Sequence, residues 1–115
     1  MSTQRKFVLL GATGSIGTST LRVLRKHSDK LELIGVSAHS RAGELAAIVD
    51  EFKVPYAHLS RKLDDLPSFP AGTNLSYEAD ALNHLATLPE AEFVVIAVVG
   101  TAGLKPTLAA LEAGK

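Results

Sequence analysis

Three glycines near the amino terminus have a spacing that suits phosphate binding. They lie in Gly11-Ala12-Thr13-Gly14-Ser15-Ile16-Gly17, which follows the pattern G-x-x-G-x-x-G. We call residues 11–17 the glycine turn. In such a turn the first glycine reverses the chain sharply, the second lets a pyrophosphate approach the backbone, and the third lets a helix pack closely on a strand.

Phosphates bind in such turns to backbone N–H groups at the positive end of a helix. Here those donors are the N–H groups of Gly14, Ser15 and Ile16, and the hydroxyls of Thr13 and Ser15 can add to them. The alternative is a plain strand-to-helix turn in which Thr13 or Ser15 is only the helix N-cap. Because the turn follows an apolar run and precedes a helical pattern, we favour nucleotide binding.

A second polar segment lies about twenty residues further on, where a dinucleotide-binding domain holds the adenosine ribose. A domain that prefers NAD usually carries a carboxylate there. This chain has His39, Ser40 and Arg41 and no carboxylate. A guanidinium and a hydroxyl suit a ribose 2′-phosphate, and His39 can stack on the adenosine or contact that phosphate, so the segment predicts NADP. The alternative is that Ser40 caps a helix and Arg41 is solvated in its first turn.

A third turn, Val99-Gly100-Thr101-Ala102-Gly103, follows the last apolar run. If that run pairs beside the first one, the turn lies where the strand order reverses and a dinucleotide crevice opens. We expect its backbone either to line the cofactor site or to form a plain loop. Other chemistry is disfavoured, because the four histidines share no metal-binding spacing, cysteine is absent, and Asp64-Asp65 is typical of a solvated loop pair.

The spacing of apolar residues predicts the elements that position these turns. Four runs have strand length, at residues 7–10, 31–36, 56–59 and 93–99. Between them the period becomes helical, so we expect covering helices with one apolar face each. The predicted faces are Ile16, Thr20, Val23, Leu24 and His27; Leu45, Ile48, Val49 and Phe52; Ala81, Leu85 and Leu88, with Asp80 as N-cap; and Leu104, Leu108 and Leu111, with Pro106 in the first turn.

This alternation predicts an α/β fold, a doubly wound parallel sheet of the Rossmann type, with the strands in the spatial order 3-2-1-4. Only residues 60–73, with two prolines and a glycine, interrupt the pattern. They predict a surface loop, with a short irregular strand near Leu75. A two-half fold needs two more strands after the helix that ends at Gly114, so we expect residues 1–115 to be one domain of a longer protein, truncated after the fourth β-α unit.

Composition disfavours several partners. The chain has 115 residues, enough for one core, and its 12 basic and 12 acidic residues cancel. No overall field therefore attracts nucleic acid or anionic lipid. The apolar run before Gly11 is only four residues long, at residues 7–10, too short for a signal peptide or a membrane span. We expect a cytoplasmic domain with a small-molecule ligand.

Two longer segments resemble the 1-deoxy-D-xylulose 5-phosphate reductoisomerases. One is LGATGSIGTSTL, from Leu10 to Leu21, and the other is AVVGTAGLKPTLAALEAGK, from Ala97 to Lys115. The second segment is the more specific, since Gly-Ala-Thr-Gly also occurs in semialdehyde dehydrogenases and extended short-chain dehydrogenases. Together the two segments bracket nearly the whole chain.

The resemblance implies the NADPH-binding domain of an enzyme of the non-mevalonate isoprenoid pathway. Such enzymes rearrange 1-deoxy-D-xylulose 5-phosphate and reduce the resulting aldehyde to 2-C-methyl-D-erythritol 4-phosphate with hydride from NADPH. By resemblance, Thr13, Gly14, Ser15 and Ile16 bind the pyrophosphate region of NADPH. The segment His39, Ser40 and Arg41, where many members have Gly-Lys-Asn, surrounds the adenosine phosphate.

The resemblance also implies what lies outside residues 1–115. An Asn-Lys-Glu motif that touches NADPH and substrate is expected a few residues past Lys115, followed by the ligands of a divalent metal (Mg, Mn or Co) and the groups that hold the substrate phosphate. We therefore expect the chain alone to be catalytically inactive and the full-length enzyme to be a homodimer. The alternatives are a non-catalytic NADP-binding sensor and a structural module that binds no cofactor.

Overall fold

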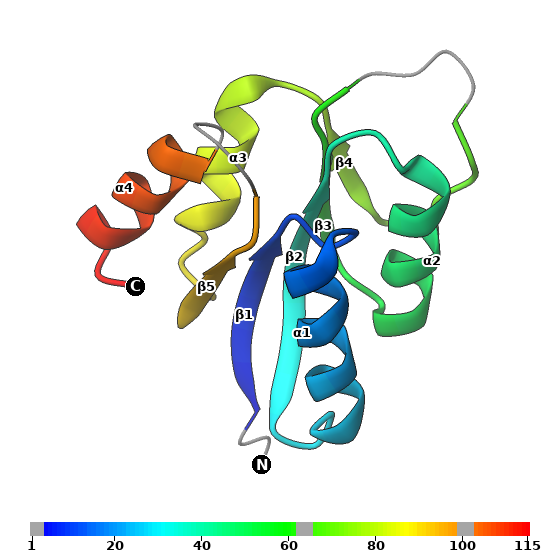
Figure 1. Cartoon of the computed structure of the whole chain (residues 1–115), viewed down its shortest axis with the longest axis horizontal. Coiled ribbons are helices and arrows are strands. Elements are labelled where there is room, and N and C mark those ends of the chain that lie inside the picture. The colour runs from blue at the N-terminus through cyan, green and yellow to red at the C-terminus, as the bar shows by residue number, and fades with distance from the viewer. Residues whose placement is uncertain (1–3, 62–65, 99–102) are drawn as a thin grey trace.

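The computed structural model describes residues 4–61, 66–98 and 103–115 (Figure 1). These residues form a parallel sheet of five strands in the spatial order β4-β3-β2-β1-β5, with helices on both faces. The predicted doubly wound α/β fold is confirmed, and so is the order of the four predicted strands. In chain order the elements are β1 (Arg5–Leu10), α1 (Ser15–Lys26), β2 (Leu31–Ala38), α2 (Ala42–Phe52), β3 (Tyr56–Leu59), β4 (Asn74–Ser76), α3 (Ala79–Ala86), β5 (Phe93–Ile96) and α4 (Leu104–Glu112).

Strand β1 is the centre of the molecule because it is apolar on both faces. Phe7 and Leu9 point into the core that α1 and α2 cover, whereas Val8 and Leu10 point into the core on the side of α3 and α4. All four side chains are buried. The short strand expected near Leu75 is present as β4, which pairs with β3 at the edge of the sheet.

The predicted face was partly wrong on α1, where only Leu24 of the predicted residues is buried, and wrong on α4. On α1 the buried residues are Gly17, Leu21 and Leu24, while Ile16 and Val23 are 63% and 51% exposed. On α4 the inward residues are small: Pro106 and Ala110 are buried, whereas the predicted face of Leu104, Leu108 and Leu111 is exposed. On α4 these small residues let the helix approach its neighbours closely, so a stripe counted from large residues selected the wrong face.

The other two helices follow the prediction more closely. On α2 the residues Leu45, Ile48 and Val49 are buried. On α3 the N-cap is Glu78, and Asp80 lies in the first turn instead of capping the helix as predicted. No helix in the described parts of the chain has the length and apolar character needed to cross a membrane.

Candidate functional site

The glycine turn joins the end of β1 to the start of α1 and has the two tight contacts that its spacing predicts. Gly11 has a φ of +89°, a backbone conformation that favours glycine, and a Cβ there would lie 2.8 Å from the carbonyl carbon of Ala97. A Cβ on Gly17 would collide with the carbonyl oxygen of Gly11. The first and third glycines are therefore required for the sharp turn and for the close packing of α1.

The middle of the turn is open. A Cβ on Gly14 would meet no atom within 4 Å, and Gly14, Ser15 and Ile16 are all exposed, with Thr13 half-buried. Gly14 is itself the N-cap of α1 and no side chain caps this helix, so the alternative role of Thr13 or Ser15 as N-cap is wrong. The first N–H groups of a helix have no partner within it. Here they face the open side, where an anion can reach them.

Ser37 on β2 holds the start of the turn in place. Its carbonyl oxygen accepts hydrogen bonds from the N–H groups of Gly11 (3.2 Å) and Ala12 (2.8 Å), and its Oγ accepts a second one from Gly11 (3.0 Å). Ser37 is 2% exposed. This residue was not among the predicted site residues. The signal for it was a hydroxyl in the apolar second half of β2, just before the predicted ribose-binding segment.

The end of β2 brings the second predicted segment to the same edge of the sheet. Leu10 and Ser37 are paired in register, so β1 and β2 end together and both turns leave from their carboxyl ends (Figure 1). His39 and Arg41 are exposed and Ser40 is half-buried. Arg41, not Ser40, is the N-cap of α2, and it makes no side-chain cap bond. The alternative that Ser40 caps this helix is therefore wrong.

Arg41 lies within reach of one carboxylate. Its Nη1 is 3.5 Å from Oε1 of Glu44, and the two side chains are 66% and 56% exposed. An ion pair this exposed contributes little free energy, because water competes for both charges. The guanidinium thus stays available to a phosphate arriving from solvent.

The third predicted turn is only partly described. Residues 99–102 lie outside the described ranges, as does the Asp64-Asp65 pair. Gly103, at the N-cap of α4, is buried, and a Cβ there would lie 2.7 Å from Cγ2 of Val98. Strand β5 pairs with β1 through Leu10 and Ile96, so the chain leaves β5 at the edge that carries the glycine turn.

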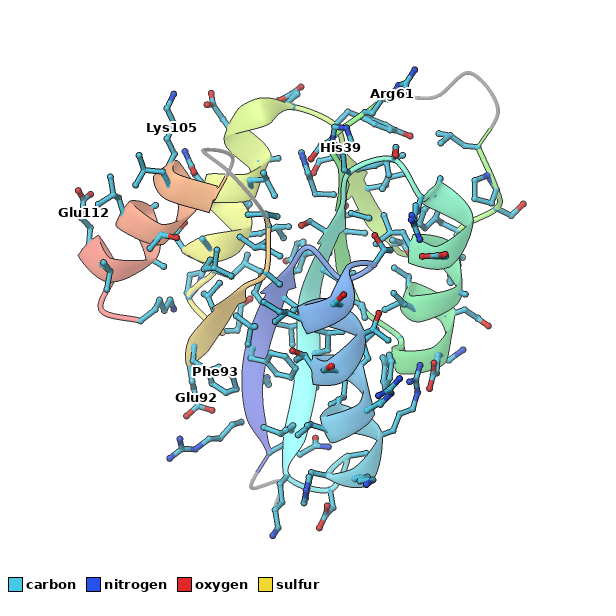
Figure 2. All side chains as sticks on the ribbon, in the orientation of Figure 1. His39, Arg61, Glu92, Phe93, Lys105 and Glu112 are labelled. Atoms are coloured by element: carbon cyan, nitrogen blue, oxygen red, sulfur yellow. The ribbon has the colours of Figure 1, made fainter. Side chains whose placement is uncertain are left out.

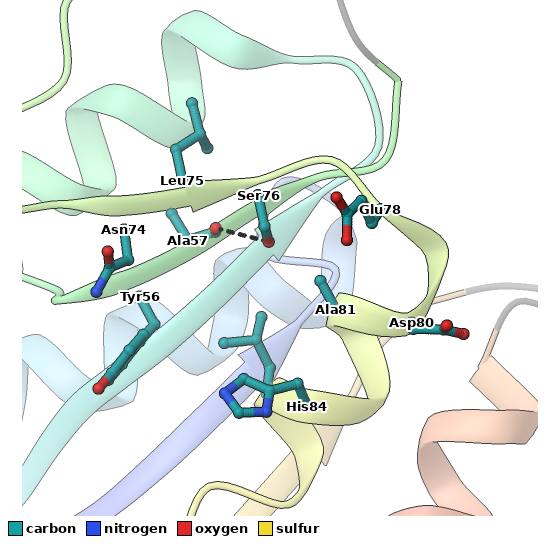
Figure 3. Close-up of a pocket in the computed structure, with 10 residues that line it drawn as sticks. Tyr56, Ala57, Asn74, Leu75, Ser76, Glu78, Asp80, Ala81 and His84 are labelled. Carbon is teal, nitrogen blue, oxygen red and sulfur yellow. Dashed lines mark hydrogen bonds between the residues drawn. The ribbon is translucent and has the colours of Figure 1, made fainter.

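A cavity of about 520 Å³ lies away from these turns. It is lined by α3, by β3 and by the edge strand β4. Figure 3 shows Tyr56 and Asn74 at one end and Glu78 at the other. Ser76 lines this cavity, and its hydroxyl already has a hydrogen-bond partner, because Oγ lies 3.1 Å from Nδ1 of the buried His58. A dinucleotide lies across the carboxyl ends of strands instead, so we place the candidate site at the glycine turn.

His58 is a buried imidazole whose surroundings change its acidity. It is 1% exposed, and burial lowers the pKa of its ring below the ordinary value of 6.5. The ring is therefore neutral at pH 7. In the described ranges no three side chains of the His, Cys, Asp or Glu type are grouped so that they can hold a metal ion.

Taken together, the sheet order, the glycine turn and the uncapped start of α1 define a Rossmann-like α/β domain of the kind that binds dinucleotides. A model of the 1-deoxy-D-xylulose 5-phosphate reductoisomerase family matches residues 7–115. The chain belongs to that family.

Individual relatives are similar to this chain over nearly its whole length. The reductoisomerase of Clostridium kluyveri (strain NBRC 12016) is 39% identical over 96% of this chain, and that of Pseudomonas fluorescens (strain Pf0-1) is 42% identical over 100% of it. The chain spans 30% and 31% of the lengths of these two proteins.

Solved structures show the same likeness. The reductoisomerase from Zymomonas mobilis in complex with NADPH aligns with a TM-score of 0.84, at 31% identity over 100% of this chain and 31% of that protein. A reductoisomerase in complex with NADPH, fosmidomycin and magnesium aligns with a TM-score of 0.84, at 34% identity over 96% of this chain and 28% of that protein.

Proposed function

We propose that this chain is the NADPH-binding part of a 1-deoxy-D-xylulose 5-phosphate reductoisomerase. The observation that carries the proposal is the open, uncapped N-terminus of α1 at the end of β1. Next to it lies the end of β2, which offers His39, Ser40 and Arg41 and no carboxylate. The first feature suits a pyrophosphate, and the second suits a ribose that carries a 2′-phosphate.

The pyrophosphate of NADPH binds to Thr13, Gly14, Ser15 and Ile16 in this proposal. Backbone N–H groups in the first turn of α1 supply the hydrogen bonds, and the helix dipole adds a partial positive charge at the same point. Gly14 matters because a side chain there would occupy the space through which the phosphates approach. The backbone thus recognises the charge that NAD and NADP share.

The choice of NADP over NAD is made at the end of β2. His39 lies where the adenosine is expected, and Ser40 and Arg41 supply a hydroxyl and a guanidinium to the 2′-phosphate. Binding replaces the weak exposed pair between Arg41 and Glu44 with a pair to a doubly charged group. No carboxylate among residues 38–41 repels that group.

For the full-length protein we propose the reaction of the family, conversion of 1-deoxy-D-xylulose 5-phosphate to 2-C-methyl-D-erythritol 4-phosphate, which combines an isomerase and an oxidoreductase step. Bound NADPH supplies the hydride. Residues 1–115 form the N-terminal cofactor domain, while the ligands of the divalent metal and of the sugar phosphate belong to the rest of the protein. The enzyme is proposed to be a cytoplasmic homodimer, and this chain alone to be inactive.

The metal proposal draws on relatives rather than on this chain. Related reductoisomerases have been solved in complex with magnesium. Among the described residues no cluster can hold such an ion. The proposal is that the metal of the full-length protein is bound by groups outside residues 1–115. A sensor that binds NADP without catalysis is not favoured by any feature of the fold.

The test is a titration of the purified chain with NADPH, followed by the fluorescence of the dihydronicotinamide. Wild-type protein is expected to bind, and Gly14→Val is expected to abolish binding because the new side chain fills the approach to the helix N-terminus. Ser19→Val is the matched control, since it places the same side chain at an exposed position one turn further along α1.

Two results would contradict the proposal. One is no binding of NADPH by the folded wild-type chain. The other is an unchanged affinity in the Gly14→Val variant, which would mean that the phosphates do not approach the middle of the glycine turn.

A further inference from the structure

The ends of β2 and β3 are joined beyond the last paired residues of the two strands. The N–H of Ser60 donates to the carbonyl oxygen of Ala38 (3.0 Å), and the N–H of Arg61 donates to that of His39 (2.7 Å). The first bond continues the parallel ladder in which Ala38 pairs with Leu59, and the second joins the loop residues that follow it. They fix the backbone of Arg61 beside the segment proposed to surround the adenosine phosphate.

Arg61 presents its charge at this same edge of the sheet. The residue is exposed, and Figure 2 shows it next to His39 at the carboxyl ends of the strands. Arg41 has Glu44 within 3.5 Å, whereas no salt bridge to Arg61 occurs among the described residues. Two arginines thus follow neighbouring strand ends, Arg41 after β2 and Arg61 after β3, and Arg61 has no carboxylate partner in the described ranges.

We propose that Arg61 is a second determinant of specificity for the ribose 2′-phosphate. The inference rests on the proposed function, because it assumes that the adenosine lies over His39. A phosphate offers three strong acceptor oxygens, more than one guanidinium satisfies, so it can be bound from two sides at once. Arg41 binds it from the start of α2 and Arg61 from the end of β3.

This arrangement predicts different effects of Arg61 on ligands with and without a ribose 2′-phosphate. Arg61 contributes to binding only when the ribose carries the 2′-phosphate, because the pyrophosphate is bound elsewhere, at the N-terminus of α1. A variant that lacks this guanidinium should therefore lose affinity for 2′-phosphorylated ligands and keep its affinity for the others. The contribution should also fall with rising salt, since the side chain is exposed.

The experiment titrates two fragments of the cofactor into the chain by calorimetry: adenosine 2′,5′-bisphosphate and adenosine 5′-monophosphate. Arg61→Ala is expected to weaken binding of the bisphosphate about tenfold, as for the loss of one hydrogen bond to a charged group. Binding of the monophosphate, which lacks the 2′-phosphate, is expected to change less than about twofold. Arg61→Lys should recover part of the loss, because it restores charge without the planar fork of donors.

Arg22→Ala is the matched control, since it removes an exposed arginine from the middle of α1. It is expected to leave both affinities unchanged. The Arg61→Ala variant retains the backbone N–H that donates to the carbonyl oxygen of His39, so thermal melting should confirm that it remains folded.

The outcomes separate this inference from the function on which it rests. If the wild-type chain prefers the bisphosphate and the Arg61→Ala variant keeps the same preference, the role of Arg61 is overturned. The proposed function is then unaffected. An equal loss for both fragments also overturns it, because the residue would then not distinguish the 2′-phosphate. Failure of the folded wild-type chain to bind NADPH or either fragment overturns both.

Discussion

Removing one buried hydroxyl should loosen the glycine turn without touching any group that contacts the cofactor. The change is Ser37→Ala, which deletes the Oγ that accepts a hydrogen bond from the N–H of Gly11 at 3.0 Å. The carbonyl oxygen of Ser37 remains as a second acceptor for that N–H, at 3.2 Å. The donor therefore keeps a partner, although at the long end of the normal range.

The size of the effect follows from this shared donor. A buried N–H left without any partner costs about 1–3 kcal/mol, whereas the net loss of one neutral hydrogen bond costs about 1 kcal/mol. The second case applies, so the free energy of unfolding should fall by about 1 kcal/mol. For a chain of this size the melting temperature should fall by about 4 °C. If all of this free energy is lost from NADPH binding at the glycine turn, the affinity for NADPH falls at most about fivefold.

Thermal melting and NADPH titration together test this reasoning. Ser76→Ala is the control, because it also removes a hydroxyl that is bonded in the sheet, to His58, but far from the glycine turn. It should lower the melting temperature and leave NADPH affinity unchanged. Ser37→Thr keeps the hydroxyl and should retain affinity. The reasoning is refuted if Ser37→Ala leaves both stability and affinity unchanged, or if Ser76→Ala weakens NADPH as much.

Three further changes have distinct expected results. Arg41→Ala should weaken NADPH relative to NADH by about 1.5 kcal/mol, and equal losses for the two cofactors in parallel titrations would argue against phosphate recognition. Gly17→Ala should lower the free energy of unfolding by about 3 kcal/mol because its Cβ meets backbone, while Gly43→Ala, whose Cβ meets nothing within 4 Å, should not destabilise the chain in denaturant melts. Because burial lowers the pKa of His58, the unfolded chain takes up a proton at a higher pH than the folded chain does, so stability should fall as pH drops below about 6.5. Melts at several pH values should show a smaller fall in His58→Gln, and an equal fall in that variant would contradict this assignment.

The sequence was sufficient for the sheet but not for the orientation of every helix. Strand order followed from apolar runs and from the alternation of strand and helix, both of which are local patterns. The face of α1 was only partly predicted, with Leu24 buried as expected, because its close contact with the turn depends on Gly17, which has no side chain to contribute to an apolar count. The same reason applies to α4, where Ala110 is buried and Leu108 is exposed.

The candidate site, like the fold, was predicted only in part from the sequence. The conformations of Gly11 and Gly17 could be predicted because a turn this tight constrains the backbone within a few residues. Ser37 acts on the turn from another strand, 26 residues away in sequence, and no local spacing points to it. Its role depends on the register of β1 against β2, which the sequence did not specify to the residue.

Arg61 shows why unknown strand register matters for predicting the choice between NAD and NADP. That choice is usually judged from the residues that follow the second strand, and there this chain offers a single arginine. In a parallel sheet, however, the next strand ends at the same edge, and its first loop residues continue the ladder. Here the bond from Arg61 to His39 brings in a second guanidinium that belongs to a segment predicted from the sequence to be a surface loop. Under the proposal for Arg61, the charge that meets a 2′-phosphate is set by register across two strand ends. A substitution in the loop after β3 is then expected to alter cofactor preference while the residues after β2 stay the same.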